Sequence, residues 1–412
     1  MRVQDKAFVR RQSAFKHSAA TLSSRILPAL IYTHPGSSSI FLFLHRSIRP
    51  EEKMTGKVLN RTLSANAFLL ILPFVVVLFF AVLSCGDDDE SGPLVGIVYD
   101  EAGKGDKSFN DSAYEGIKRA QEELGTVVSE EITDGTESHR EELIRSLAAN
   151  NDLVIAVGFL FENSIKKVAA EYPDTNFAGI DIQQGNDPPE NFASLLFNEA
   201  EGSFLVGVAA ALTTKTDKVG FIGGLCATPD KLIEKFEAGF IAGVKTVNPD
   251  ITVKTEYLTG FRDIAGGKRV ALRMFGEDAD VVFHAAGTSG LGLFDAAKEF
   301  SNAEGTEVWA IGVDSDQYQT VEESVREHIL TSMLKRVDVA VYNIIEAQKN
   351  GEFSGGAVNH DLANNGVDYA TSGGFVDDIK DVLEAYKTLI INDVIEVPND
   401  PDNEGCLTPQ TY

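Results

Sequence analysis

Cysteine is scarce in this sequence, with three residues among 412. So few cysteines exclude a fold that is held together by a framework of disulfide bonds. Signatures of several enzyme classes are also missing: the chain has no Gly-x-Ser-x-Gly hydrolase elbow, no His-Glu-x-x-His zinc motif and no lysine-bearing loop that cradles a phosphate. The histidines are scattered without the spacing of zinc ligands. We therefore expect no catalytic residue, no metal site and no cofactor.

Positive charge falls far short of negative charge after the first 84 residues. The whole chain has a formal net charge of −26. Residues 1–84 carry eleven Lys or Arg and three Asp or Glu, a net charge of +8, which leaves −34 on residues 85–412. This acidity argues against a nucleic-acid partner. It fits either an ordinary solvated surface or adaptation to a salty medium, where screening shortens the reach of charge repulsion.

One long apolar run lies near the start, in MTGKVLNRTLSANAFLLILPFVVVLFFAVLSCGDDDE. Lys57 and Arg61 precede the uncharged run Ala67–Leu83, and the small Ser84 stands before Cys85. This order is typical of a secretory signal. Its end resembles a bacterial lipobox, which implies cleavage before Cys85 and a lipid on that cysteine, with the following residues as a polar leash. The alternative is an uncleaved anchor helix with a buried cysteine.

The ends of the chain carry little periodic pattern. Residues 1–53 are basic, and we interpret them as the product of an upstream start, with Met54 as the true start; a cytoplasmic extension of an anchor is the alternative. The last segment, PNDPDNEGCLTPQTY, is polar and reads as disordered. Cys226 and Cys406 could pair in an oxidising compartment, but spacing alone leaves that question open.

The body of the chain alternates between apolar runs and amphipathic stretches. Residues 110–124 and 228–246 each place apolar side chains on one helical face. Such alternation predicts an α/β fold with parallel sheets covered on both faces, and its length favours two lobes. The predicted strands are LVGIVY (94–99), LVIAVG (153–158), FAGID (177–181), VGFIGG (219–224), VVFHAAG (281–287) and VWAIGVD (308–314).

The segments that follow these strands carry the chemistry, because ligands bind beyond the carboxyl ends of strands in open α/β sheets. They contain carboxylates, a lysine, glycines and phenylalanines. Carboxylates suit a ligand with several hydroxyls, and two phenylalanines suit a flat ring. A nucleoside has both parts. The segments include Asp100 with Lys107-Ser108-Phe109-Asn110, then Asp181, Phe261-Arg262-Asp263, Thr288-Ser289-Gly290, Asp314-Ser315-Asp316 and Lys335.

At these residues the chain resembles the basic membrane lipoprotein family, the purine-nucleoside-binding proteins of ABC importers. The matching segments are DEAGKGDKSFNDSAYEG, GG…KFEAGFIAG, GFRD, AAGTSGLG and IGVDSDQ with SMLKRVD, which together span about residues 94–345. The resemblance implies two Rossmann-like lobes of the type I periplasmic-binding class, joined by a hinge, with the nucleoside in the cleft between them.

The resemblance also implies roles for eight residues. Phe109 and Phe261 would sandwich the base, whereas Asp100 and Asn110 would hydrogen-bond its edges. The remaining roles are these: Asp314 takes the ribose hydroxyls, Lys335 stands beside it, Gly287 lets the backbone approach the ligand, and Asp181 is a further polar contact. The loop Glu101–Asp106 departs from the family pattern, which leaves its own ligand contacts open.

The expected organisation follows the same resemblance. The segments are 1–53 as a non-native or disordered extension, 54–84 as the signal peptide, 85–92 as the lipid-anchored linker, 93–211 as lobe 1, 212–332 as lobe 2, 333–352 as the return helix of lobe 1, 353–396 as the return to lobe 2 with the hinge, and 397–412 as a disordered tail.

Each site residue also has a structural alternative. Phe109 could pack on Ile117 or Tyr114 as a hydrophobic staple. Asp314 could cap the next helix, and Lys335 could be a solvated side chain near the hinge. Phe236 fits a core stripe better than a ligand contact.

We expect a monomeric, lipid-anchored binding protein at the cell membrane, facing the periplasm or the exterior. Its ligand would be inosine, guanosine or adenosine, and its partners the ABC permease and ATPase subunits. One rival is a sensor or sugar-binding protein of the same fold, against which the single tryptophan, Trp309, argues mildly. Another is a nucleoside hydrolase, which would need a cluster of carboxylates around a metal ion; Asp314 and Asp316 supply two such carboxylates.

Overall fold

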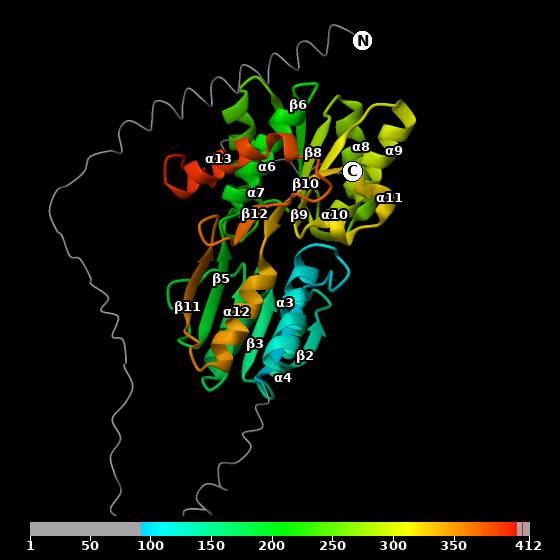
Figure 1. Ribbon diagram of the computed structural model, residues 1–412. Helices are drawn as coiled ribbons and strands as arrows, with labels where there is room; N and C mark the ends of the chain where they lie inside the picture. Colours follow the sequence, from blue (N-terminus) through cyan, green and yellow to red (C-terminus); the bar gives the residue numbers. More distant parts are fainter. Residues whose placement is uncertain (1–91, 402–405, 407–412) are drawn as a thin grey trace, which may run out of the picture. The chain divides into compact units, whose positions relative to one another are not determined.

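The computed structural model describes residues 92–401 and Cys406 (Figure 1). The predictions for the extension 1–53, the signal 54–84, the lipidated Cys85 with its linker, and most of the tail 397–412 lie outside the described residues. None of the helices in the described part of the chain combines the length and apolar composition needed to cross a membrane.

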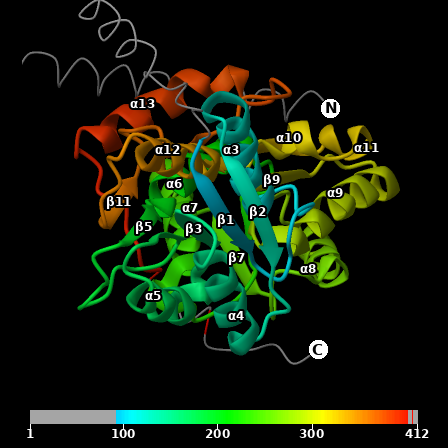
Figure 2. The same cartoon turned by 90° about the horizontal axis from the view of Figure 1, so that it is seen from below.

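The first lobe is built on a six-stranded sheet in which every pairing is parallel (Figure 2). Its central strands are buried along almost their whole length, which is why the sequence shows them as continuous apolar runs. The strands, in spatial order, are β11 (Gly356–His360), β5 (Phe192–Phe197), β4 (Asn176–Ile180), β3 (Leu153–Val157), β1 (Leu94–Tyr99) and β2 (Val127–Ile132).

The second lobe has another six-stranded sheet, parallel except for one antiparallel pair between β10 and β12. The spatial order is β12 (Val367–Tyr369), β10 (Ile329–Lys335), β9 (Trp309–Asp314), β8 (Val281–Ala285), β6 (Lys218–Gly223) and β7 (Thr252–Tyr257). Both sheets confirm the predicted α/β class.

Helices flank both sheets. Those that pack with the first sheet or with one another beside it are α3 (Phe109–Leu124), α4 (Glu137–Ala148), α5 (Glu162–Glu171) and α12 (Val337–Lys349). Those of the second lobe are α6 (Glu199–Thr213), α7 (Leu232–Val247), α8 (Ile264–Gly276), α9 (Leu291–Glu304), α10 (Gln317–Thr320), α11 (Glu323–Arg326) and α13 (Lys380–Ile391). Short 3₁₀ turns lie at Phe159–Phe161, Pro229–Lys231, Gly287–Gly290 and Asp377–Ile379.

The chain passes between the lobes three times. It crosses from β5 to α6 at Asn198, from β10 to α12 at Arg336, and from β11 to β12 in residues 361–366. These three crossings form the hinge region of the fold.

Two segments differ from the expected lobe boundaries. The strand β11 pairs with β5 in the first sheet, although residues 353–396 were assigned to lobe 2 and the hinge. Helix α6 packs against α7, β10 and β12, although residues up to 211 were assigned to lobe 1. Both errors have one physical cause. Each segment lies next to a point where the chain passes between the lobes, so residues that are adjacent in the sequence pack in different hydrophobic cores. The remaining boundaries stay a prediction.

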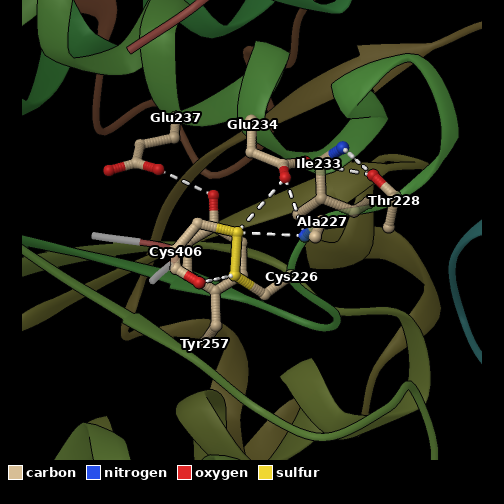
Figure 3. Close-up of a disulfide and its surroundings, with 8 residues drawn as sticks. All are labelled: Cys226, Ala227, Thr228, Ile233, Glu234, Glu237, Tyr257 and Cys406. Atoms are coloured by element: carbon tan, nitrogen blue, oxygen red, sulfur yellow. Dashed lines mark hydrogen bonds between the residues drawn. A yellow bond between two sulfur atoms is a disulfide. The ribbon is translucent and has the colours of Figure 1, made fainter. Parts of the chain in front are cut away.

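A disulfide joins Cys226, just after β6, to Cys406 in the tail, with a Cα–Cα distance of 5.4 Å (Figure 3). The neighbouring Ala227 donates its backbone N–H to Glu234 Oε1 over 2.8 Å, and the Thr228 hydroxyl donates to Glu234 Oε2 over 3.0 Å. The pairing that the sequence left open therefore ties the tail to the loop that leads into α7.

Candidate functional site

Residues from both lobes line one cavity that encloses about 650 Å³, part of it open to solvent. Asp100, Asp181, Asp314 and Lys335 in its lining stand where strands end, as is usual for ligand sites on parallel sheets. All eight predicted site residues lie in this lining: Asp100, Phe109, Asn110, Asp181, Phe261, Gly287, Asp314 and Lys335. The structure thus brings the whole predicted set together, while their roles toward a ligand stay a prediction.

Aromatic rings enter the cavity from both lobes. Phe109 is the first residue of α3, and Phe261 follows β7 in the second lobe. The Phe261 ring lies so close to Gly224 that a Cβ there would come within 2.3 Å of it, so only glycine fits. Gly287 has φ +51°, and its position beside Phe261 also favours glycine. Phe159 meets Phe261 edge-on, with ring centroids 6.3 Å apart.

Phe109 and Phe236 serve the core and the cavity together. Phe109 packs against the main hydrophobic cluster, which includes Ile117, and still lines the cavity. Phe236 is 3% exposed and belongs to the same cluster, as the core-stripe interpretation expects, yet it also lines the cavity. The structural and the ligand-facing interpretations of these two residues are therefore compatible.

A polar network at the start of α3 holds the first set of donors and acceptors. The Asp106 carboxylate accepts hydrogen bonds from the backbone N–H groups of Ser108, Asn110 and Asp111 over 2.8–3.1 Å, and so caps the helix from outside its first turn. The Asn110 amide donates to Asp106 Oδ2 and to Asp100 Oδ1, each over 2.9 Å. The amide oxygen of Asn110 is buried without a protein partner. This oxygen is therefore available to accept a hydrogen bond from a ligand.

Burial changes the protonation of Asp100. It raises the pKa of this carboxyl to about 6, against the opposing effect of hydrogen bonds from Ala102 N–H and from Asn110. Burial also raises the pKa of Asp106. The loop that departs from the family pattern thus contributes a helix cap, and Asp106 is a cavity residue that the sequence interpretation left undecided.

A buried ion cluster surrounds Lys335. This side chain lines the cavity and is 1% exposed. Its ammonium lies 2.7 Å from Asp181 Oδ2 and 3.0 Å from Glu199 Oε1. Burial lowers the pKa of Lys335, but the charges of Asp181, Glu199 and Asp314 outweigh that effect, and the pKa lies above its usual value. Burial raises the pKa of Glu199. The alternative of a solvated Lys335 is wrong, because carboxylates and not water surround it.

Three phenylalanine rings enclose the same ammonium. Its nitrogen lies 5.0–5.6 Å from the ring centroids of Phe109, Phe197 and Phe236. Such contacts favour a cation and exclude water from the cluster.

Asp314 ends β9 with a φ of +63°, in the left-handed region that a non-glycine residue adopts at a cost. Asp181, which follows β4, has φ +60°. The Asp314 Oδ2 atom accepts a 2.5 Å hydrogen bond from the Ser108 hydroxyl. Burial raises the pKa of Asp314 to about 7, against the opposing effects of Lys335 and Ser108. The helix-cap alternative is wrong, since Asp316 holds the N-cap position of α10 and the first helical N–H, that of Gln317, donates to the Ser332 hydroxyl.

Sequence reasoning missed two buried polar residues. Glu199 stands just beyond the apolar strand β5, so the strand-end rule that found Asp181 and Asp314 could have found it. Ser108 lies in the loop before Phe109, and the sequence analysis assigns it no role. Among the described residues, no three His, Cys, Asp or Glu side chains gather closely enough to hold a metal ion.

Comparison with known proteins gives a consistent picture. The family model described as "ABC transporter substrate-binding protein PnrA-like" (Bmp) matches residues 94–401. The ABC transporter nucleoside-binding protein BmpA of Lactococcus lactis is 35% identical over 315 residues, which cover 74% of this chain and 88% of that protein. The CD4+ T-cell-stimulating antigen of Listeria innocua is 34% identical over 361 residues, 82% of this chain and 99% of that protein.

The fold also has solved counterparts. The crystal structure of an ABC transporter solute-binding protein from Aeropyrum pernix K1 superposes with a TM-score of 0.66 and 28% identity, and the match covers 76% of this chain and 94% of that chain. The fold is therefore that of periplasmic-binding proteins of type I, as expected.

Lys335→Met should destabilise the protein strongly, because Asp181 and Glu199 would stay buried without their cation. We expect the free energy of unfolding to fall by roughly 3–5 kcal/mol, measured by urea denaturation at neutral pH. Lys387→Met is the matched control: its ion pair with Asp368 is more exposed, so we expect less than about 1 kcal/mol. Equal losses in the two variants would contradict this account of the cluster.

Proposed function

The chain belongs to the PnrA-like substrate-binding proteins of ABC transporters, and on that basis we propose that its ligands are purine nucleosides: inosine, guanosine or adenosine. The observation that supports this most is the composition of the cavity, in which phenylalanine rings from both lobes accompany carboxylates at the strand ends. Flat rings bind a base by stacking, and ionised carboxylates accept hydrogen bonds from sugar hydroxyls.

Each residue has a defined task in this proposal. Phe109 and Phe261 stack on the two faces of the base. Asp100 and Asn110 bind its edge, and the unpartnered Asn110 oxygen accepts an N–H of the purine. The ribose hydroxyls meet Asp314, with Lys335 supplying positive charge behind it, while Gly287 leaves room for the ligand and Asp181 holds the lysine.

The cavity is less suited to the rival functions. Trp309, the single tryptophan, packs on Phe375 with centroids 4.8 Å apart and is not among the cavity residues, so it offers no platform for a sugar. Asp316, the second acid of the hydrolase alternative, accepts a hydrogen bond from Ser372 and likewise lies outside the cavity lining. A binding role without catalysis explains the site best.

In this role the lobes close around the nucleoside and exclude water. The loaded protein then docks on a membrane permease, and the partner ATPase supplies the free energy of transport. A lipid on Cys85 would hold the protein at the outer face of the membrane, where it meets extracellular nucleosides.

Calorimetric titration tests the ligand. We expect inosine, guanosine and adenosine to bind, and free ribose to bind far more weakly because it lacks the base. Phe109→Ala and Phe261→Ala should each weaken nucleoside binding by roughly 1–3 kcal/mol, the usual contribution of a base stacked on an aromatic side chain. Phe375→Ala, which removes a phenylalanine outside the cavity, is the control. Tight binding of ribose alone would refute the proposal.

Nucleoside affinity should depend on pH. Burial raises the pKa of Asp314 to about 7 and that of Asp100 to about 6, and the ionised forms are the better acceptors for the ribose hydroxyls and for N–H groups of the base. Binding therefore favours loss of these protons, so the affinity for inosine should be highest near pH 8, fall by up to about tenfold per pH unit between the two pKa values and fall more steeply below both. Asp314→Asn should bind weakly at pH 8 with a flatter profile. A dissociation constant that is unchanged or smaller at pH 5 would contradict the ribose role of Asp314.

The lipid anchor is tested by Cys85→Ser in cells that process lipoproteins. We expect a fatty-acid label to be incorporated into the unaltered protein and not into the variant, because one cysteine carries the whole lipid attachment. An unaltered protein that takes up no label and keeps the run Ala67–Leu83 would favour the anchor-helix alternative.

A further inference from the structure

A buried serine makes one of the direct contacts between the two lobes. The Ser108 hydroxyl, in the loop that leads into α3, lies 2.5 Å from Asp314 Oδ2 and 3.3 Å from the carbonyl oxygen of Val313 at the end of β9. In return, the Ser315 hydroxyl donates to the carbonyl oxygen of Ser108 over 3.1 Å. Ser108 is 0% exposed and is not among the residues that line the cavity. It therefore acts on the opposite lobe and not on the ligand itself.

The loop presents this serine rigidly. Asp106 accepts the backbone N–H of Ser108, and Asp111 accepts the backbone N–H groups of Gly105 and Lys107 over 2.7 and 3.0 Å. Lys107 has φ +58°, a strained conformation that these bonds hold in place. The hydroxyl of Thr320, in the second lobe, lies 3.4 Å from the Lys107 carbonyl oxygen and adds a weaker contact.

The contact occupies one of the two oxygens of the Asp314 carboxylate, which is also the carboxylate proposed to bind the ligand. Ser108 takes Oδ2 of Asp314, which leaves Oδ1 as the oxygen free of this bond. A hydrogen bond between a hydroxyl and an ionised carboxylate is among the stronger hydrogen bonds in proteins. Because Asp314 is held in the left-handed region at the end of a strand, this bond also fixes the direction of its carboxylate.

We propose that Ser108 is an interlobe latch and a positioning residue: its hydroxyl orients Asp314 for the ligand and holds the two lobes together. The part that concerns the ligand rests on the proposed function. The part that concerns closure does not, since every bond of the latch is made between protein groups. The latch thus stabilises the closed arrangement before a ligand arrives and slows the escape of a bound one.

Kinetics with inosine test the latch in the presence of ligand. In stopped-flow measurements at pH 8, Ser108→Ala should release inosine about tenfold faster, with an association rate within about twofold of the unaltered protein. Ser112→Ala is the matched control. It removes a buried hydroxyl one turn further along α3, whose oxygen accepts a hydrogen bond from the backbone of Asp338 in α12, a helix of the same lobe. We expect its release rate to be unchanged.

Small-angle X-ray scattering of the ligand-free protein tests closure without any nucleoside. Ser108→Ala should have a larger radius of gyration than the unaltered protein and Ser112→Ala. If the unaltered protein binds no nucleoside, the proposed function fails while this measurement still decides on the latch. Unchanged scattering together with an unchanged release rate would overturn the inference, as would equal effects in Ser112→Ala.

A second variant tests the proposal even if Ser108→Ala does not fold. Ser315→Ala removes only the return bond to the Ser108 carbonyl, and Ser315 is less buried than Ser108. It should change both the release rate and the scattering in the same direction as Ser108→Ala, by a smaller factor. No change in Ser315→Ala, when Ser108→Ala fails to fold, would count against the latch.

Discussion

The burial of one lysine among carboxylates is the constraint on which the rest of this structure depends. Lys335 ends β10 at one crossing between the lobes, and Glu199 begins α6 at another. Their ion pair, with Asp181 at the end of β4, ties the crossings to the first sheet. A buried charge without its partner costs several kcal/mol, so the lobes cannot rearrange freely at this point. The hinge can bend around the cluster, but the cluster itself has to stay intact.

The same cluster sets the electrostatics of the cavity. Lys335 opposes the rise in the pKa of Asp314 that burial causes, and so keeps this carboxyl able to ionise near neutral pH. Three phenylalanine rings shield the ammonium, and Phe109 among them also faces the cavity. One ring therefore contributes to the core, to the shielding of a buried charge and to the proposed base site. Backbone strain in the site lies at strand ends, where Asp181 and Asp314 adopt positive φ angles.

The walls of the cavity are held by contacts from distant parts of the chain. The loop before α7 has positive φ angles at Ala227, Asp230 and Lys231, and the disulfide to Cys406 fixes its start. Helix α7 then supplies Leu232, Ile233 and Phe236 to the cavity. On the opposite lobe, the capped start of α3 carries Phe109 and Ser108. Both walls are thus prepared by protein contacts, which lowers the entropy cost of binding a ligand.

The α/β class follows from the residue pattern of the chain, and the candidate site residues follow from that pattern together with the family resemblance. Strands buried on both faces leave continuous apolar runs, and parallel strands present their carboxyl ends on one side of their own sheet, which places Asp100 near Asp181. That Asp314, in the other sheet, faces the same cleft is what the family resemblance implies. The contacts between these groups become visible in the folded protein alone. The Ser108–Asp314 bond and the Cys226–Cys406 pair join residues 206 and 180 positions apart. The structure also shows that β11 pairs with β5 in the first sheet and that α6 packs in the second lobe. Contacts over such separations leave no periodic trace in the chain, because periodicity records which face of an element is buried and not which partner buries it.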